Sequence, residues 1–356
     1  MTVQDLYKEL DQDLHLKDLT SREPVDIELE EEMLIQILND TVETSWGRNS
    51  LDRVTIDRWL SNFVGSVFDM SYERKLALIL AVHMVYYSES DICYLVKVAY
   101  KKLIHEIMLM QNKSLEDVIG SIVFLPLGKV SESGPFLSYY FRKENDLSID
   151  FFVSSIGDVW NLEGTDTIVL MDDVSISGGQ VTRFLNKLKK ESRLNSKNLY
   201  ALFLVSTVKA KKDLEDMNVH LCAPIMMDER SQCFKKQSSI YAIFDDEVRD
   251  TIRFHSKCMS QIYGYKLILK QYLVNGELQR LLDAKKTTEQ IKEKIEKDSL
   301  GFDDSELLIS FEYNTPNNCL PIIWCSNDEW IPLFRRSDKL YTSQVVGGIK
   351  NDIYYI

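Results

Sequence analysis

The sequence predicts an α/β protein in which a parallel sheet is flanked by helices, with an α-helical extension before it and a small α+β element after it. Three observations lead to this prediction. Apolar residues recur at helical spacing before residue 118. From residue 119 onward, short β-type runs alternate with helical patterns, which is typical of a parallel sheet. After residue 270, a charged helical stretch precedes a short strand pattern and a segment rich in Asn and Pro.

The segment 1–118 is predicted to be an N-terminal helical extension. Leu29, Met33, Leu34 and Ile37 recur at helical spacing after an acidic run, and acidic residues are favourable at the start of a helix. Further apolar stripes cover 56–63, 76–83 and 95–107. No catalytic group of residues is recognisable in this segment.

The segment 119–270 is predicted to be the α/β core. We expect strands at 121–125, 149–153, 167–171, 199–205 and 219–226, and helices at 181–188 and 208–215. The segment 271–356 contains a helix with interleaved charges, which we expect to be a solvated surface helix, and a strand at 307–312. The element that follows this strand is predicted either to form a hood over the site or to staple the tail to the core.

Composition excludes several classes of protein. Hydrophobic residues make up 45% and charged residues 27% of the 356, which is typical of a globular chain and not of a disordered one. The net charge of −13 argues against a general nucleic-acid binder, because phosphate contacts need clustered Lys and Arg. The apolar runs are too short for a membrane span and the N-terminus is too polar for a signal peptide, so we expect a cytoplasmic protein. Six cysteines without CxxC spacing are interpreted as buried thiols.

The most informative run is TIVLMDDVSISGGQ, from Thr167 to Gln180. It predicts a buried strand with two carboxylates at its carboxyl end, then a turn of small residues and a helix. Ligands bind at this edge of open α/β sheets, and a helix N-terminus offers free N–H groups to an anion. Two carboxylates would repel that anion unless they bind ribose hydroxyls or hydrated Mg²⁺. The run therefore predicts a site for a phosphorylated ribose with Mg²⁺; the alternative is an acidic turn without a ligand.

This run resembles the signature of the type I phosphoribosyltransferases. The resemblance implies that Asp172 and Asp173 are catalytic, face the ribose hydroxyls of phosphoribosyl pyrophosphate and bind Mg²⁺. It also implies that the loop after them holds the 5′-phosphate, through Ser175, Ile176, Ser177, Gly178, Gly179 and Gln180.

Two weaker features occur in the order that this family requires. Leu127, Gly128 and Lys129 follow a predicted strand and resemble the turn that binds pyrophosphate through backbone N–H groups. Arg142 and Lys143 resemble the basic residues of the flexible catalytic loop of orotate-type members, which close over the leaving group. The alternatives are a surface lysine at 129 and a helix end at 142–143.

The sequence departs from the family pattern at two positions. The phosphate loop usually ends in Thr or Ser, and Gln180 lacks that hydroxyl. Purine-salvage members place an aspartate where this chain has Ile176, so we expect no purine-base acceptor.

Three segments resemble a defence-associated bacterial branch of the PRTase-CE type, which includes retron-associated effectors. These segments are Trp59–Phe63, Asp228–Arg230 and the run FEYNTPNNCLPIIW from Phe311 to Trp324. The resemblance implies an effector that acts on phosphoribosyl pyrophosphate or a related nucleotide within an oligomer or complex. It implies a reverse transcriptase and its RNA–DNA product as partners, reached through protein contacts. The alternatives are a non-catalytic nucleotide sensor and a structural subunit.

Overall fold

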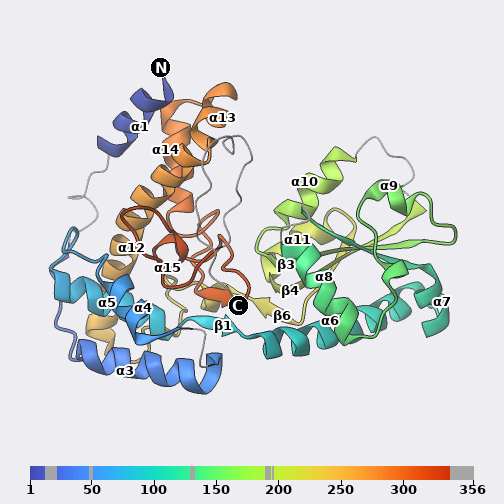
Figure 1. Cartoon of the computed structure of the whole chain (residues 1–356), viewed down its shortest axis with the longest axis horizontal. Coiled ribbons are helices and arrows are strands. Elements are labelled where there is room, and N and C mark those ends of the chain that lie inside the picture. The colour runs from blue at the N-terminus through green and yellow to red at the C-terminus, as the bar shows by residue number, and fades with distance from the viewer. Residues whose placement is uncertain (13–21, 48–50, 129–132, 189–193, 195, 337–356) are drawn as a thin grey trace, which may run out of the picture.

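The computed structural model describes residues 1–12, 22–47, 51–128, 133–188, 194 and 196–336. The chain forms two lobes, a helical lobe and an α/β lobe, joined along one side by the long helix α6 (Glu89–Gln111) (Figure 1). Within the described residues, none of the helices combines the length and the apolar character needed to cross a membrane.

A parallel sheet forms the centre of the α/β lobe. Its strands run in the order β2 (Ile122–Pro126), β3 (Thr167–Ser175), β4 (Asn198–Thr207) and β5 (Val219–Cys222), and β6 (Ile225–Met227) pairs with the end of β4. The helices of this lobe are α7 (Leu115–Ser121), α8 (Ser133–Glu144), α9 (Ile156–Val159), α10 (Gly179–Lys187) and α11 (Val208–Glu215). The expected α/β class with a parallel sheet flanked by helices is confirmed.

Side chains that alternate along the strands supply two separate cores, one on each face of the sheet. On one face, Phe124 and Leu202 belong to the core that includes Leu137 of α8 and the apolar residues of α6. On the other face, Leu170 and Phe203 pack with residues of α10 and α11. Helices therefore cover both faces, and β3 is an inner strand buried along its whole length.

The strands differ from the prediction in three places. Strand β3 continues to Ser175, so both aspartates lie inside it. The expected strand at 149–153 is wrong: Ile149–Phe151 is a short 3₁₀ helix, because the Ser148 side chain caps the Asp150 amide locally. The expected strand at 219–226 is broken at Pro224, which has no N–H for a sheet ladder.

The helical lobe is built from both ends of the chain. Helix α12 (Asp246–Val274) packs against α5 (Met70–Val82), from the first part of the chain, and against α15 (Pro321–Trp324), from the last part. Strand β1 (Val85–Tyr87) pairs in parallel with β7 (Ile309–Phe311). The other elements of this lobe are α1 (Val3–Gln12), α3 (Glu31–Thr41), a π-helical turn (Val42–Trp46), α4 (Arg53–Leu60), α13 (Glu277–Asp283) and α14 (Thr288–Asp298).

This arrangement corrects the expected boundary at residue 270. That position falls inside the continuous helix α12. The Trp59 indole Nε1 also donates to the Ile322 carbonyl at 2.8 Å, deep inside the lobe. Segments 1–118 and 271–336 therefore do not form separate units, because each supplies strands and buried side chains that the other needs.

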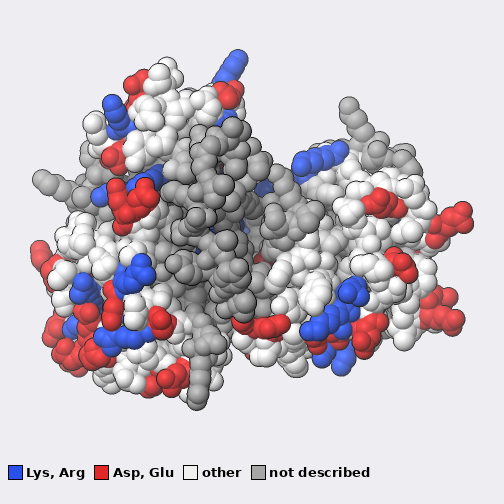
Figure 2. Space-filling model, in the orientation of Figure 1, with Lys and Arg blue, Asp and Glu red and all other residues white. Residues whose placement is uncertain are grey.

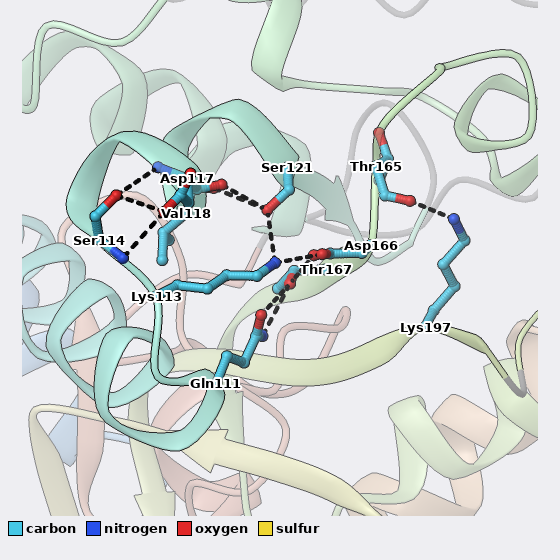
Figure 3. A network of polar contacts seen from close by, with 10 residues as sticks. All are labelled: Gln111, Lys113, Ser114, Asp117, Val118, Ser121, Thr165, Asp166, Thr167 and Lys197. Carbon is cyan, nitrogen blue, oxygen red and sulfur yellow. Dashed lines mark hydrogen bonds and ion pairs between the residues drawn. The ribbon is translucent and has the colours of Figure 1, made fainter.

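A polar network ties α6 and α7 to the amino ends of the strands, opposite the aspartates (Figure 3). Lys113 Nζ contacts the Asp166 carboxylate and donates to Ser121 Oγ at 3.3 Å. Thr167 Oγ1 donates to Asp166 Oδ1 at 2.7 Å. Partial burial opposes ionisation of Asp166, but the hydrogen bonds from Lys113, Thr167 and Ser121 outweigh it and lower the pKa of this carboxyl.

We expect Lys113→Met to destabilise the protein by about 1 kcal/mol at pH 7, a value that allows for solvent screening of the pair. Because the pKa of Asp166 is lowered in the folded state, its contribution is present above pH 3.8 and is lost as the pH falls further. Urea unfolding at pH 7 and at pH 3 measures both effects. The matched control is Lys211→Met, which breaks an exposed pair with Glu215 on α11 and should cost only a few tenths of a kcal/mol. Equal losses in the two variants would contradict this role of the network.

Candidate functional site

The two aspartates lie at the carboxyl end of the central strand β3 and are almost completely buried. Asp172 is 2% exposed and Asp173 is 6% exposed. Asp172 Oδ1 accepts hydrogen bonds from Ser133 Oγ at 2.7 Å and from the Asp173 amide at 2.9 Å. Asp173 Oδ1 accepts from the Val174 amide at 2.8 Å, and its Oδ2 accepts from the Tyr313 hydroxyl at 3.3 Å.

The electrostatics of this pair are unfavourable for two charges. Burial raises the pKa of Asp172 well above its usual range, and the neighbouring charge of Asp173 raises it further. Burial also raises the pKa of Asp173. Among the described residues, neither carboxylate has an ion pair with Lys or Arg. The described part of the chain therefore offers no cation to neutralise a negative charge on this pair.

The loop after the aspartates is held by its own hydroxyls and by strand β4. Ser175 Oγ accepts from the Gly178 amide at 3.1 Å. From the end of β4, Ser206 Oγ donates to the Ser175 carbonyl at 2.9 Å and Thr207 Oγ1 donates to the Ile176 carbonyl at 2.6 Å. These bonds fix the loop at the carboxyl edge of the sheet.

Helix α10 begins directly after this loop. Its N-cap, Gly178, has φ +66°, and a Cβ there would lie 2.8 Å from Leu214 Cγ, so glycine is required. No side chain caps this helix start, which leaves the amides of the first turn available to an anion. Ser177 Oγ lies 3.3 Å from the position that a Cβ on Gly179 would occupy. The predicted residues from Ser175 to Gln180 are thus brought together around one helix N-terminus.

The second predicted turn lies beside Asp172. The Leu127 amide continues the β2–β3 ladder by donating to the Met171 carbonyl at 2.8 Å, and Gly128 follows with φ +95°. Helix α8 then starts so close that a Cβ on Gly134 would lie 2.2 Å from the Leu127 carbonyl oxygen. Leu127 and Gly128 therefore join the site, whereas Lys129 lies outside the described residues.

The expected catalytic loop with Arg142 and Lys143 is wrong. Both residues lie in the last turn of α8, because Leu137 and Phe141 bury one face of this helix. Ten residues separate Ser133 from Lys143, about 15 Å along the helix axis, so Lys143 is remote from the aspartates. Lys143 Nζ lies 3.8 Å from Glu144, which pairs with Lys97. The alternative interpretation, a helix end, is the correct one.

The aspartates are suited to Mg²⁺ that is shared with a ligand. Among the described residues, no group of three or more His, Cys, Asp and Glu side chains forms a metal cage. Mg²⁺, however, is usually bound by one or two carboxylates together with substrate phosphates and water. Two adjacent buried carboxylates, with no basic partner among the described residues, fit this donor set, and Asp172 and Asp173 would hold the ion.

Sequence reasoning missed two residues that contact the aspartates. Ser133 stands 39 positions before Asp172, and Tyr313 stands 140 positions after Asp173. Tyr313 belongs to the run FEYNTPNNCLPIIW, so the prediction of a hood indicated the right segment without the residue. Ser133 had no signal in the sequence. In the same element, Thr315 is buried and hydrogen bonded to Ser310 at 2.8 Å, so the segment is also stapled to the core.

Comparison with protein families identifies this architecture. The PRTase-CE family model matches residues 56–336, which span α4 to the end of the described chain and include both lobes. No curated protein and no solved structure matches the chain. The chain therefore belongs to the PRTase-CE family, and its fold is phosphoribosyltransferase-like.

Proposed function

We propose that this protein is an effector that acts on phosphoribosyl pyrophosphate, or on a related nucleotide, at C1′ of the ribose. The observation that carries this proposal is the succession, along one strand and loop, of two buried carboxylates and an uncapped helix N-terminus. Carboxylates suit ribose hydroxyls and Mg²⁺, and the helix start suits the 5′-phosphate. A ligand with all these groups spans the site from Asp172 to Gly179.

In this proposal the residues of the chain bind and orient the ligand. Asp172 and Asp173 hold the ribose, the loop from Ser175 to Gln180 anchors the 5′-phosphate, and the turn at Leu127 and Gly128 faces the leaving group. The bond from C1′ to pyrophosphate breaks and a bond from C1′ to the acceptor, or to water where no acceptor is present, forms through an oxocarbenium-like state. Bound Mg²⁺ would supply charge neutralisation for the leaving pyrophosphate.

The test is turnover by the purified protein with phosphoribosyl pyrophosphate and Mg²⁺. Release of pyrophosphate, followed by ³¹P NMR and lost in the Asp172→Asn/Asp173→Asn double variant, would support the enzyme. Calorimetry on the same samples measures binding. Binding without turnover favours the non-catalytic sensor. This sensor is the second candidate because both carboxylates are buried and Asp173 is in contact with Tyr313. Absence of binding would overturn both candidates and leave a structural subunit.

We also propose a role in a cytoplasmic bacterial defence complex with a reverse transcriptase and its RNA–DNA product. The resemblance of three segments to defence-associated proteins supports this context. On the face drawn in Figure 2, acidic and basic side chains of the described residues are mixed over both lobes. This mixture and the net charge of −13 favour contacts to nucleic acid through partner proteins. Co-expression with the neighbouring genes, followed by phage challenge, tests it: no complex, no protection and no toxicity would overturn the context.

A further inference from the structure

Among the described residues, the helical lobe contacts the two aspartates through the side chain of Tyr313. Its hydroxyl donates to Asp173 Oδ2, and its ring lies 4.6 Å, centroid to centroid, from that of Phe136 on α8. Phe136 stands one helical turn after Ser133, which donates to Asp172. In the described structure, the helical lobe thus reaches the carboxylates through Tyr313, which contacts α8 and β3.

Tyr313 is partly exposed, whereas the two carboxylates, of which it contacts Asp173, are at most 6% exposed. An extended ligand with a ribose, a phosphate and a hydrated cation needs direct access to those oxygens. In this position the Tyr313 side chain occupies the space beside Asp173 Oδ2, where such a ligand would have to bind.

The backbone holds Tyr313 firmly on the helical lobe. It stands in a tight turn in which the Phe311 amide donates to the Asn314 carbonyl at 3.0 Å and the Asn314 amide donates back at 3.1 Å. Its ring stacks on Phe311, the last residue of β7, with centroids 5.6 Å apart. Because β7 pairs with β1, the ring follows the position of the helical lobe and does not move as a free side chain.

We propose that Tyr313 is the residue through which the helical lobe controls entry to the aspartate site. The ring covers the carboxylates when the lobes are in contact, and a ligand binds when the lobe withdraws it. The identity of the ligand rests on the proposed function, whereas the covering of the carboxylates by Tyr313 does not depend on it. A protein that binds the helical lobe and displaces β7 would then open the site.

The accessibility of the two carboxylates can be measured without any ligand. A water-soluble carbodiimide and an amine label exposed carboxylates, and mass spectrometry gives the labelling rate of Asp172 and Asp173. Tyr313→Ala should speed labelling at least tenfold. Tyr313→Phe keeps the ring and should stay within twofold of the unchanged protein. The matched control is Tyr139→Ala, which removes an exposed tyrosine of α8 that has no contact with the aspartates in the described structure. Thermal unfolding of each variant identifies any general loosening, which would also speed labelling of the buried Asp298.

A second measurement uses phosphoribosyl pyrophosphate with Mg²⁺ in stopped-flow binding. Tyr313→Ala should raise the association rate constant at least tenfold, and the phenylalanine variant should leave it unchanged. Unchanged labelling in Tyr313→Ala would overturn the cover, whatever the ligand. Faster labelling with no binding by any variant would keep the cover and overturn the proposed ligand. Equal acceleration in the alanine and phenylalanine variants would overturn the role of the ring.

Discussion

Asp172→Asn is expected to lower activity about 100- to 1,000-fold, a loss typical of a missing electrostatic contact in an active site, and to stabilise the fold by about 1 kcal/mol. The asparagine oxygen still accepts from Ser133 Oγ and the Asp173 amide, so the local hydrogen bonds remain. The substitution removes a buried carboxyl whose pKa is raised first by burial and then by the neighbouring charge of Asp173. Stability and function therefore change in opposite directions.

The gain in stability should depend on pH. The pKa of Asp172 is raised on folding, so its ionisation destabilises the folded state as the pH rises from 3.8 through the raised pKa. The variant lacks this loss, and its advantage in thermal unfolding with EDTA should grow from pH 4 to pH 8. The control is Asp117→Asn, because this exposed residue in the first turn of α7 accepts a hydrogen bond from the N-cap Ser114 and has a lowered pKa, so its variant should lose stability slightly. A destabilised, fully active Asp172→Asn protein would contradict the assignment of the site.

Gly134→Ala should have the second largest effect, a loss of about 3 kcal/mol or more in the free energy of unfolding. The new Cβ would lie 2.2 Å from the Leu127 carbonyl oxygen and 3.0 Å from that of Met171. These are backbone atoms, so the clash is relieved only if α8 moves away from β2 and β3. That movement would withdraw Ser133 from Asp172, and ligand binding should fall together with stability.

Gly120→Ala provides the matched control for this substitution. Gly120 also lies in a helix, α7, but a Cβ there meets nothing within 4 Å. Alanine is the better helix former, so this variant should gain about 1 kcal/mol. Urea unfolding of the two variants under the same conditions tests the difference. A Gly134→Ala protein as stable as the unchanged chain would show that α8 is not held against the strand ends in this way.

The residues of the site divide into those that a local pattern predicts and those that only the tertiary structure reveals. The run from Thr167 to Gln180 has a strand, two carboxylates and a helix start in immediate succession, so the site and its place in the sheet follow from it. Ser133 and Tyr313 reach the aspartates from other elements, and no spacing in the sequence encodes that contact.

The same division holds for the fold. Strands β2 to β5 have strong apolar runs and were predictable within a few residues. Arg142 and Lys143 are compatible with a loop or with a helix end, and only the burial of Leu137 and Phe141 against the sheet decides between them. The helices of the helical lobe were expected, but their assembly into one lobe was not predictable, because it joins segments such as β1 and β7 that lie more than 200 residues apart in the chain.

The pairing of β1 with β7 has a consequence for the order of events during synthesis. All strands of the α/β lobe have been made by residue 227, and domains generally fold as units while the chain is extended. The helical lobe, by contrast, cannot close until β7 and α15 have left the ribosome, although its first helices emerged at the start. A nascent chain thus passes through a stage in which the loop from Ser175 to Gln180 can form while Tyr313 does not yet contact Asp173. Translation of the last hundred residues supplies Tyr313, so a chain that stops early would carry the site without its cover.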